Sequence, residues 1–127
     1  MKLQPDKSPA PLINAHGAGW IQVSGQRFEH SLLLSSNPAN LPIAWRPVRF
    51  EDLTGEDFKD WRIDETELVI FGSGTSLQFP RPQWLMHWIE QRIGVETMDT
   101  PAACRTYNIL ASEGRKVTAA LLVEPTR

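Results

Sequence analysis

The distribution of hydrophobic and polar residues along this chain predicts an α/β domain. Residues 68–71, Leu-Val-Ile-Phe, form an unbroken apolar run bounded by polar residues and glycine, which is typical of a strand buried on both faces of a sheet. We expect this strand to be central, with a short strand at residues 95–98 and a last strand at residues 115–123. Strands that are joined through helices lie parallel with right-handed crossovers, so the pattern predicts helices packed over a sheet.

Two helices are predicted between these strands. The first begins at Pro82, whose missing N–H costs little at the first helical position, runs through residue 93 and ends at Gly94 in the left-handed conformation. The second follows Thr100, the expected N-cap, and ends at Gly114. On the first helix one face is apolar and the other polar, with Trp84, Leu85, Trp88 and Ile89 on the apolar face and Gln83, His87, Glu90 and Gln91 on the polar face.

The N-terminal half of the chain predicts antiparallel strands. Residues 20–24 and 27–34 fit a β-hairpin around a Gly-Gln turn of type II′ at residues 25–26. Residues 43–48 can form only an edge strand, which we expect to border this hairpin, because Pro47 has no N–H to donate to a neighbouring strand.

A short helical turn is predicted over residues 51–58. This turn places Leu53 and Phe58 in the core and is interrupted by Gly55, a residue that disfavours helix. We expect Trp61 to cover the turn.

The length of the chain corresponds to one domain. A chain of 127 residues can bury most of a core without disulfides or metal. We expect a single α/β domain over residues 12–127, preceded by a disordered arm over residues 1–11, which combine polar residues with three prolines.

Charge and hydropathy exclude several classes of protein. The formal net charge is −2 and the Lys and Arg residues are scattered, which differs from the clustered basic surface of a nucleic-acid-binding protein. No apolar run approaches the roughly 20 residues that a membrane-spanning helix requires, so we expect a soluble protein without membrane insertion.

Neither a secretory signal nor an Arg-rich transit peptide is visible, which predicts a cytoplasmic location. The single cysteine, Cys104, gives no sign of an oxidising compartment.

The loop after the central strand is the first candidate site. Gly72, Ser73, Gly74 and Thr75 follow a strand and precede a helix, so their backbone N–H groups could bind an anion, at the sheet edge where α/β folds bind ligands. The loop lacks the lysine of a Walker motif and the spacing of a dinucleotide fingerprint. The alternative is a tight turn that simply requires glycine.

Polar residues of the second helix extend this candidate site. Arg105 could pair with an anion held by the loop, or it could form a structural ion pair with Asp99 or Glu113. Thr106 and Asn108 would supply further polar groups around a cavity between the loop and the start of the helix.

Cys104 and the tryptophans have both structural and functional interpretations. Cys104 lies near the start of the second helix, where a thiol could act as a nucleophile, but no histidine is near it in sequence to serve as base, which favours a buried thiol. Tryptophans pack in cores more often than they anchor partners, and this interpretation applies to Trp45, Trp61, Trp84 and Trp88.

The order of motifs resembles a known domain family. The motifs are the run from Leu68 to Gly74, the run from Gly94 to Thr100, the run from Ala102 to Leu110 (Ala-Ala-Cys-Arg-Thr-Tyr-Asn-Ile-Leu) and Glu113-Gly114-Arg115. Together they resemble the small domain family that includes the mitochondrial complex I (NADH:ubiquinone oxidoreductase) assembly factor, the adipogenesis-associated protein and many prokaryotic proteins of unknown function. The resemblance extends from about residue 19 to residue 123, the size of one domain.

The resemblance implies a fold and a kind of function. It implies a three-layer α/β domain with a mixed central sheet, two crossover helices and an N-terminal β-hairpin. The eukaryotic relative acts by binding another assembly factor, which implies a protein-interaction role with another protein as partner. No acid/base pair, metal cluster or activated nucleophile is recognisable, so no catalytic residue, metal or cofactor is expected. The alternative is a small-molecule (anion) binding protein or enzyme that uses the Gly72 to Thr75 loop and Arg105.

Overall fold

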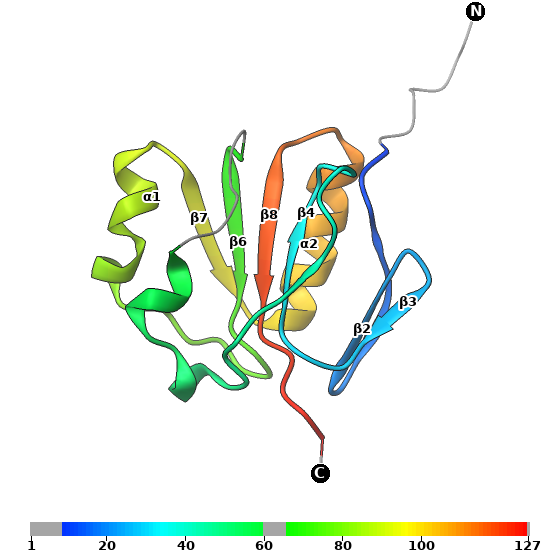
Figure 1. Cartoon of the computed structure of the whole chain (residues 1–127), viewed down its shortest axis with the longest axis horizontal. Coiled ribbons are helices and arrows are strands. Elements are labelled where there is room, and N and C mark those ends of the chain that lie inside the picture. The colour runs from blue at the N-terminus through cyan, green and yellow to red at the C-terminus, as the bar shows by residue number, and fades with distance from the viewer. Residues whose placement is uncertain (1–8, 60–65, 127) are drawn as a thin grey trace, which may run out of the picture.

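The computed structural model describes residues 9–59 and 66–126, which form two β-sheets and the helices that cover them (Figure 1). The larger sheet has five strands in the order β5-β4-β8-β6-β7, and the smaller sheet has three in the order β1-β2-β3. The strands β6 (Leu68–Gly72), β7 (Gly94–Met98) and β8 (Val117–Leu121) run parallel, whereas β4 (Leu32–Ser35) and β5 (Ile43–Ala44) extend the sheet antiparallel. The predicted mixed sheet is confirmed.

Strand β6 occupies the interior position that its apolar run predicts. It pairs with β7 on one side and β8 on the other, and Val69, Ile70 and Phe71 are fully buried. Because successive side chains of a strand point to opposite faces, Val69 and Phe71 pack into one core and Ile70 into another.

These two cores separate three layers. The first core lies between the large sheet, helix α2 (Thr100–Ser112) and the small sheet, where Tyr107 packs with Ile21 and Leu34. The second core lies on the opposite face, where Phe58 packs edge-to-face on Trp88 and stacks on Trp84. In Figure 1, α2 lies behind β4 and β8, whereas α1 (Met86–Glu90) lies beside β7.

The first crossover helix is shorter than predicted. Pro82 does begin helical structure, but as the 3₁₀ helix η3 (Pro82–Leu85), which continues into the five-residue α1. The left-handed residue is Arg92, with φ 63°, and not Gly94. Gly94 already belongs to β7, because its N–H donates to the carbonyl of Glu67 in the parallel ladder. Ile89, expected in the core, is half exposed.

Helix α2 begins one residue earlier than predicted. Its N-cap is Asp99, whose carboxylate accepts a hydrogen bond from the N–H of Ala102 at 2.9 Å. Thr100 is not the N-cap, because its hydroxyl donates instead to the carbonyl of Leu122. The helix ends before Gly114 as predicted, and Gly114 has φ +84°.

The predicted N-terminal hairpin is confirmed, but its turn and second strand differ. Strand β2 (Trp20–Val23) pairs antiparallel with β3 (Gln26–Phe28). Both turn residues, Ser24 and Gly25, have positive φ, so the turn is of type I′ and is centred one residue before the predicted position. The expected strand over residues 27–34 is divided, because the chain leaves the small sheet after β3 and enters the large sheet as β4.

The remaining elements complete both sheets. Strand β1 (Ile13–Gly17), which the sequence did not predict, pairs with β2, and β5 is the predicted edge strand but borders β4 rather than the hairpin. Two 3₁₀ helices, η1 (Phe50–Asp52) and η2 (Gly55–Phe58), form the expected helical turn, with Leu53 and Phe58 buried. Trp61 lies outside the described residues. Among the described helices, none has the length and apolar composition needed to cross a bilayer.

Candidate functional site

The predicted loop site begins where β6 ends against the first turn of α2. A side chain at Gly72 would place its Cβ 3.0 Å from the Thr100 hydroxyl and 3.1 Å from the Ala103 Cβ. Glycine therefore allows the close approach of strand and helix. The predicted proximity of the loop and the helix start is confirmed.

Three N–H groups of this loop meet acceptors within the protein. The N–H of Ser73 donates to the carbonyl of Met98 at 2.8 Å, and the N–H of Gly74 donates to the Thr100 hydroxyl at 2.9 Å. The N–H of Thr75 donates to the carboxylate of Glu124 at 2.8 Å. The loop therefore already holds a carboxylate, one supplied by the chain's own C-terminal segment.

A cavity of about 410 Å³ adjoins the loop. It lies between Gly74 and Thr75, the start of α2, the turn that joins β1 to β2, and Glu124. Its lining is mostly apolar and includes Trp20. A cavity of this volume matches small-molecule sites in size.

The predicted helix residues do not line this cavity. Arg105 is exposed and forms no ion pair with any residue in ranges 9–59 and 66–126, so the suggested pairs with Asp99 and Glu113 are not formed. Asn108 instead connects α2 to the small sheet, because its side chain accepts from the N–H of Ile13 at 2.8 Å and donates to the Ile13 carbonyl at 2.6 Å. Thr106 is half-buried on the same helix.

Cys104 has the properties of a structural thiol. Its side chain is fully buried in the first core, and burial raises the pKa of the thiol to about 12, against a smaller opposing effect of the Arg105 charge. The protonated thiol is not a nucleophile at neutral pH, so the structural interpretation is confirmed.

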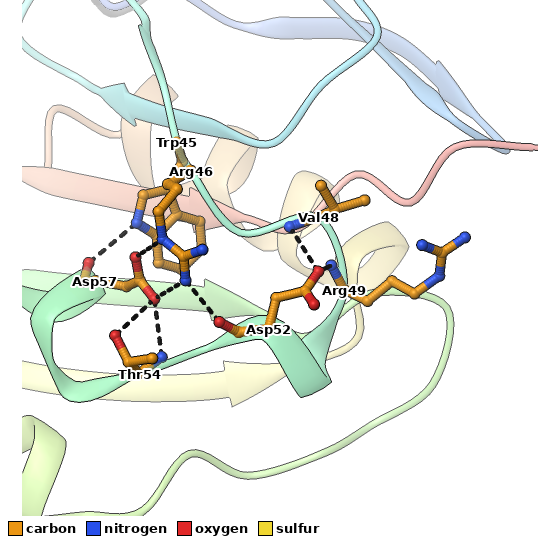
Figure 2. A network of polar contacts seen from close by, with 7 residues as sticks. All are labelled: Trp45, Arg46, Val48, Arg49, Asp52, Thr54 and Asp57. Atoms are coloured by element: carbon orange, nitrogen blue, oxygen red, sulfur yellow. Dashed lines mark hydrogen bonds and ion pairs between the residues drawn. The ribbon is translucent and has the colours of Figure 1, made fainter.

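A polar network that the sequence analysis missed joins the two 3₁₀ helices (Figure 2). The buried carboxylate of Asp57 accepts hydrogen bonds from Arg46 Nε at 2.8 Å, Arg46 Nη2 at 2.7 Å and the N–H of Thr54 at 2.8 Å. The indole of Trp45 donates to the Asp57 carbonyl, and Asp52 accepts from the N–H of Arg49. The Thr-x-x-Asp spacing is the capping-box signal that could have revealed this network.

The electrostatics of Asp57 indicate a structural role. Burial alone would raise the pKa of this carboxyl, but the hydrogen bond and charge of Arg46, together with the N–H of Thr54, outweigh burial and lower the pKa below its ordinary value. The carboxylate is therefore ionised, and its hydrogen bonds to Arg46 and Thr54 fix the 3₁₀ helices.

A second missed feature is an apolar surface at the edge of the large sheet. Large hydrophobic side chains of one segment are exposed to solvent, by 53% for Leu77, 68% for Phe79, 43% for Met86 and 50% for Ile89. Phe79, Leu85, Ile89, Val95, Glu96 and Thr97 line a groove of about 440 Å³ between this segment and β7, which we call the β7 groove. The sequence placed Ile89 inward, so its contribution to a surface was not foreseen.

The fold and these surfaces define a small three-layer α/β domain. Its glycine loop donates N–H groups to acceptors within the protein, and one edge of its large sheet is apolar. The profile of a family described as proteins of unknown function (DUF498/DUF598) matches residues 13–122. The chain belongs to this family.

Relatives and solved structures agree with this assignment. The chain is 32% identical over 126 residues to NADH dehydrogenase (ubiquinone) 1 alpha subcomplex assembly factor 3 of Mus musculus, a match that covers 97% of this chain. The chain spans 66% of the length of that relative. An uncharacterized protein of Rhodobacter capsulatus is 32% identical over 124 residues, covering 96% of this chain and 92% of that protein.

Two solved structures of Bordetella proteins are similar to this chain. A crystal structure from Bordetella parapertussis has a TM-score of 0.82 and 32% identity, covering 91% of this chain and 97% of that one. A solution structure from Bordetella pertussis, described as an Mth938-like domain, has a TM-score of 0.76 and 31% identity, covering 98% and 94%. The family resemblance and the α/β architecture expected from the sequence are confirmed.

Proposed function

We propose that this domain is a non-enzymatic protein-interaction module with an assembly-factor-like role, and that the β7 groove is its binding surface. The observation that carries the proposal is the exposure of Phe79 and Ile89 on the same groove. Single exposed hydrophobic residues are ordinary, whereas several around one groove are typical of a protein-binding site. Met86 lies three residues before Ile89 on α1, and so extends the same helix face.

Two further observations support this proposal. Relatives at about this level of identity are named as assembly factors, and assembly factors act on other proteins. The scattered basic residues and the small net charge favour a protein partner over a nucleic acid. We also propose a cytoplasmic location, because the single cysteine gives no sign of an oxidising compartment.

The test is a comparative capture experiment. Tagged wild-type protein, a Phe79→Ser/Ile89→Ser variant and a Leu41→Ser/Ile109→Ser variant are incubated with lysate of the native cell, and the recovered proteins are quantified by mass spectrometry. Leu41 and Ile109 are exposed hydrophobic residues outside the groove, so the second variant is a matched control. We expect the same partner with wild type and control, and at least a tenfold loss with the groove variant. Equal recovery by all three proteins contradicts the proposed surface.

The alternative function is an anion-binding protein or enzyme, which the 410 Å³ cavity beside Gly74 and Thr75 favours. An external anion would have to displace the Glu124 carboxylate from the N–H of Thr75. The test is the melting temperature of wild type and of Thr75→Pro, which lacks that N–H, with a panel of phosphorylated and carboxylate metabolites. A ligand that stabilises wild type and loses about tenfold or more in affinity in the variant supports the anion site, because a charged hydrogen bond contributes roughly 1.5–3 kcal/mol. No shift with any metabolite leaves the interaction module as the proposal.

A further inference from the structure

Strand β7 has one unpaired edge. It is the last strand of the large sheet and pairs only with β6 among the described residues. The N–H of Gly94 donates to Glu67 and the carbonyl of Met98 accepts from Ser73, so Gly94, Glu96 and Met98 direct their backbone groups toward β6. Since these groups alternate along a strand, Val95 and Thr97 direct their N–H and C=O outward.

The two faces of β7 differ in chemistry. Val95 packs against the core that contains Trp88, and it lines the β7 groove together with Thr97. Glu96 borders the groove, but side chains alternate along a strand, so its carboxylate belongs to the face of Met98, which packs against the opposite core. Glu96 is exposed and forms no ion pair with a described residue. A strand beside β7 would meet an apolar groove on one face and a carboxylate on the other.

We propose that an extended segment of a partner protein adds to β7 as a sixth strand of the large sheet. Alternate apolar side chains of this segment enter the β7 groove, and a lysine or arginine between them lies beside Glu96. Main-chain hydrogen bonds to Val95 and Thr97 supply affinity, as in other proteins that bind peptides by strand addition. This inference rests on the proposed function and specifies the chemistry of the partner.

The charge of Glu96 argues against a second copy of this chain as the added strand. Only Val95 and Thr97 offer outward backbone groups, so an antiparallel pair of β7 strands that uses both must place Val95 of one copy opposite Thr97 of the other. That register places Glu96 opposite Glu96, and like charges directly opposite each other are destabilising. A basic segment replaces this repulsion with attraction.

The test uses synthetic peptides as probes. Two fluorescent ten-residue peptides carry valine at alternate positions, with lysine between the valines in one and glutamate in the other, and their binding is measured by fluorescence anisotropy. We expect the lysine peptide to bind wild type at least tenfold more tightly than the glutamate peptide. A lysine peptide with N-methylated backbone groups should fail to bind, because it cannot form the strand ladder. Failure of both unmethylated peptides to bind at millimolar concentration overturns the proposal.

Variants of β7 test the hydrogen bonds and the charge separately. Thr97→Pro removes an outward N–H but no hydrogen bond to β6, so it should retain the fold and abolish peptide binding, whereas Thr97→Val should bind normally. Glu96→Lys should reverse the preference to the glutamate peptide, and Glu113→Lys, the same charge change at the end of α2, should not. If Thr97→Pro fails to fold, hydrogen exchange of wild type decides, with slowed exchange at Val95 and Thr97 expected when the lysine peptide binds.

The outcomes separate this inference from the proposed function. If folded Thr97→Pro binds the lysine peptide as wild type does, or if the two peptides bind equally, no strand is added in the proposed way. The groove variant of Phe79 and Ile89 can still lose its captured partner in that case, and the proposed function then stands alone. A wild-type dimer that Thr97→Pro dissociates, detected by sedimentation, would identify a second copy as the occupant and overturn the inference.

Discussion

Removal of the Asp57 carboxylate should destabilise the fold more than removal of an exposed carboxylate nearby. The Asp57 side chain is 6% exposed, whereas its partner Arg46 is 60% exposed and can be hydrated when the pair is broken. Hydrogen bonds to charged groups contribute roughly 1.5–3 kcal/mol, and the N–H of Thr54 would also lose its acceptor, so Asp57→Ala should cost about 3 kcal/mol. For a domain of this size such a loss lowers the melting temperature by about 10 °C.

The assay is thermal unfolding followed by circular dichroism at pH 7, with Glu56→Ala as the control. Glu56 pairs with Lys59 on the surface, where an ion pair contributes about 1 kcal/mol or less. If the melting temperature of Asp57→Ala lies within 2 °C of that of Glu56→Ala, the role assigned to the buried carboxylate is refuted.

The same carboxylate predicts a pH dependence. Because its pKa in the folded state is lowered from the ordinary 3.8, its contribution to stability is fully present above that ordinary value and is lost as the pH falls through the folded-state pKa. The difference in unfolding free energy between wild type and Asp57→Ala should therefore be constant between pH 5 and pH 7 and shrink below about pH 4. A difference that grows on acidification would contradict this sign.

Three further predictions concern the loop, the helix and the thiol. Asn108→Ala removes both bonds to the Ile13 backbone and should cost about 1–2 kcal/mol, with faster hydrogen exchange at Ile13. Gly74→Ala should cost about 1–3 kcal/mol in urea unfolding, because φ is +103° and a Cβ would lie 2.7 Å from a carboxylate oxygen. Gly114→Ala, with φ +84° and open space, is its control and should cost less. Cys104 should resist a thiol reagent at pH 8 until urea unfolds the protein, and rapid labelling of the folded protein would contradict its burial.

The sequence predicted the elements whose chemistry is local. The apolar run of β6, the glycine at the end of α2 and the short helical turn around Phe58 all follow from residue types within a few positions of one another. Strand β1 was missed because only Ile13 of its five residues is a large apolar residue. Its strand conformation depends on pairing with β2 and on Asn108, a residue 95 positions away.

The candidate site was predicted only in part for a similar reason. The order of strands and helices brings the Gly72 loop to the start of α2, and this follows from topology. The buried positions Cys104, Tyr107 and Ala111 leave Arg105 on the exposed face, so the helical period already argued against Arg105 as a lining residue. The β7 groove was not foreseen because it depends on how far the short α1 covers the edge strand, which no local pattern encodes.

The two edges of the large sheet explain why β7 is the better surface for strand addition. Strand β5 has two residues, and the segment that continues it contains Pro47, so the outer side of β5 offers few backbone groups to a partner. Strand β7 has five residues and no proline, and Glu96 is its single charged residue. An edge of this length that carries one carboxylate discourages pairing with its own copy yet remains open to a basic strand. The β5 edge therefore offers little to an added strand, whereas the β7 edge favours a basic strand over a second copy of this chain.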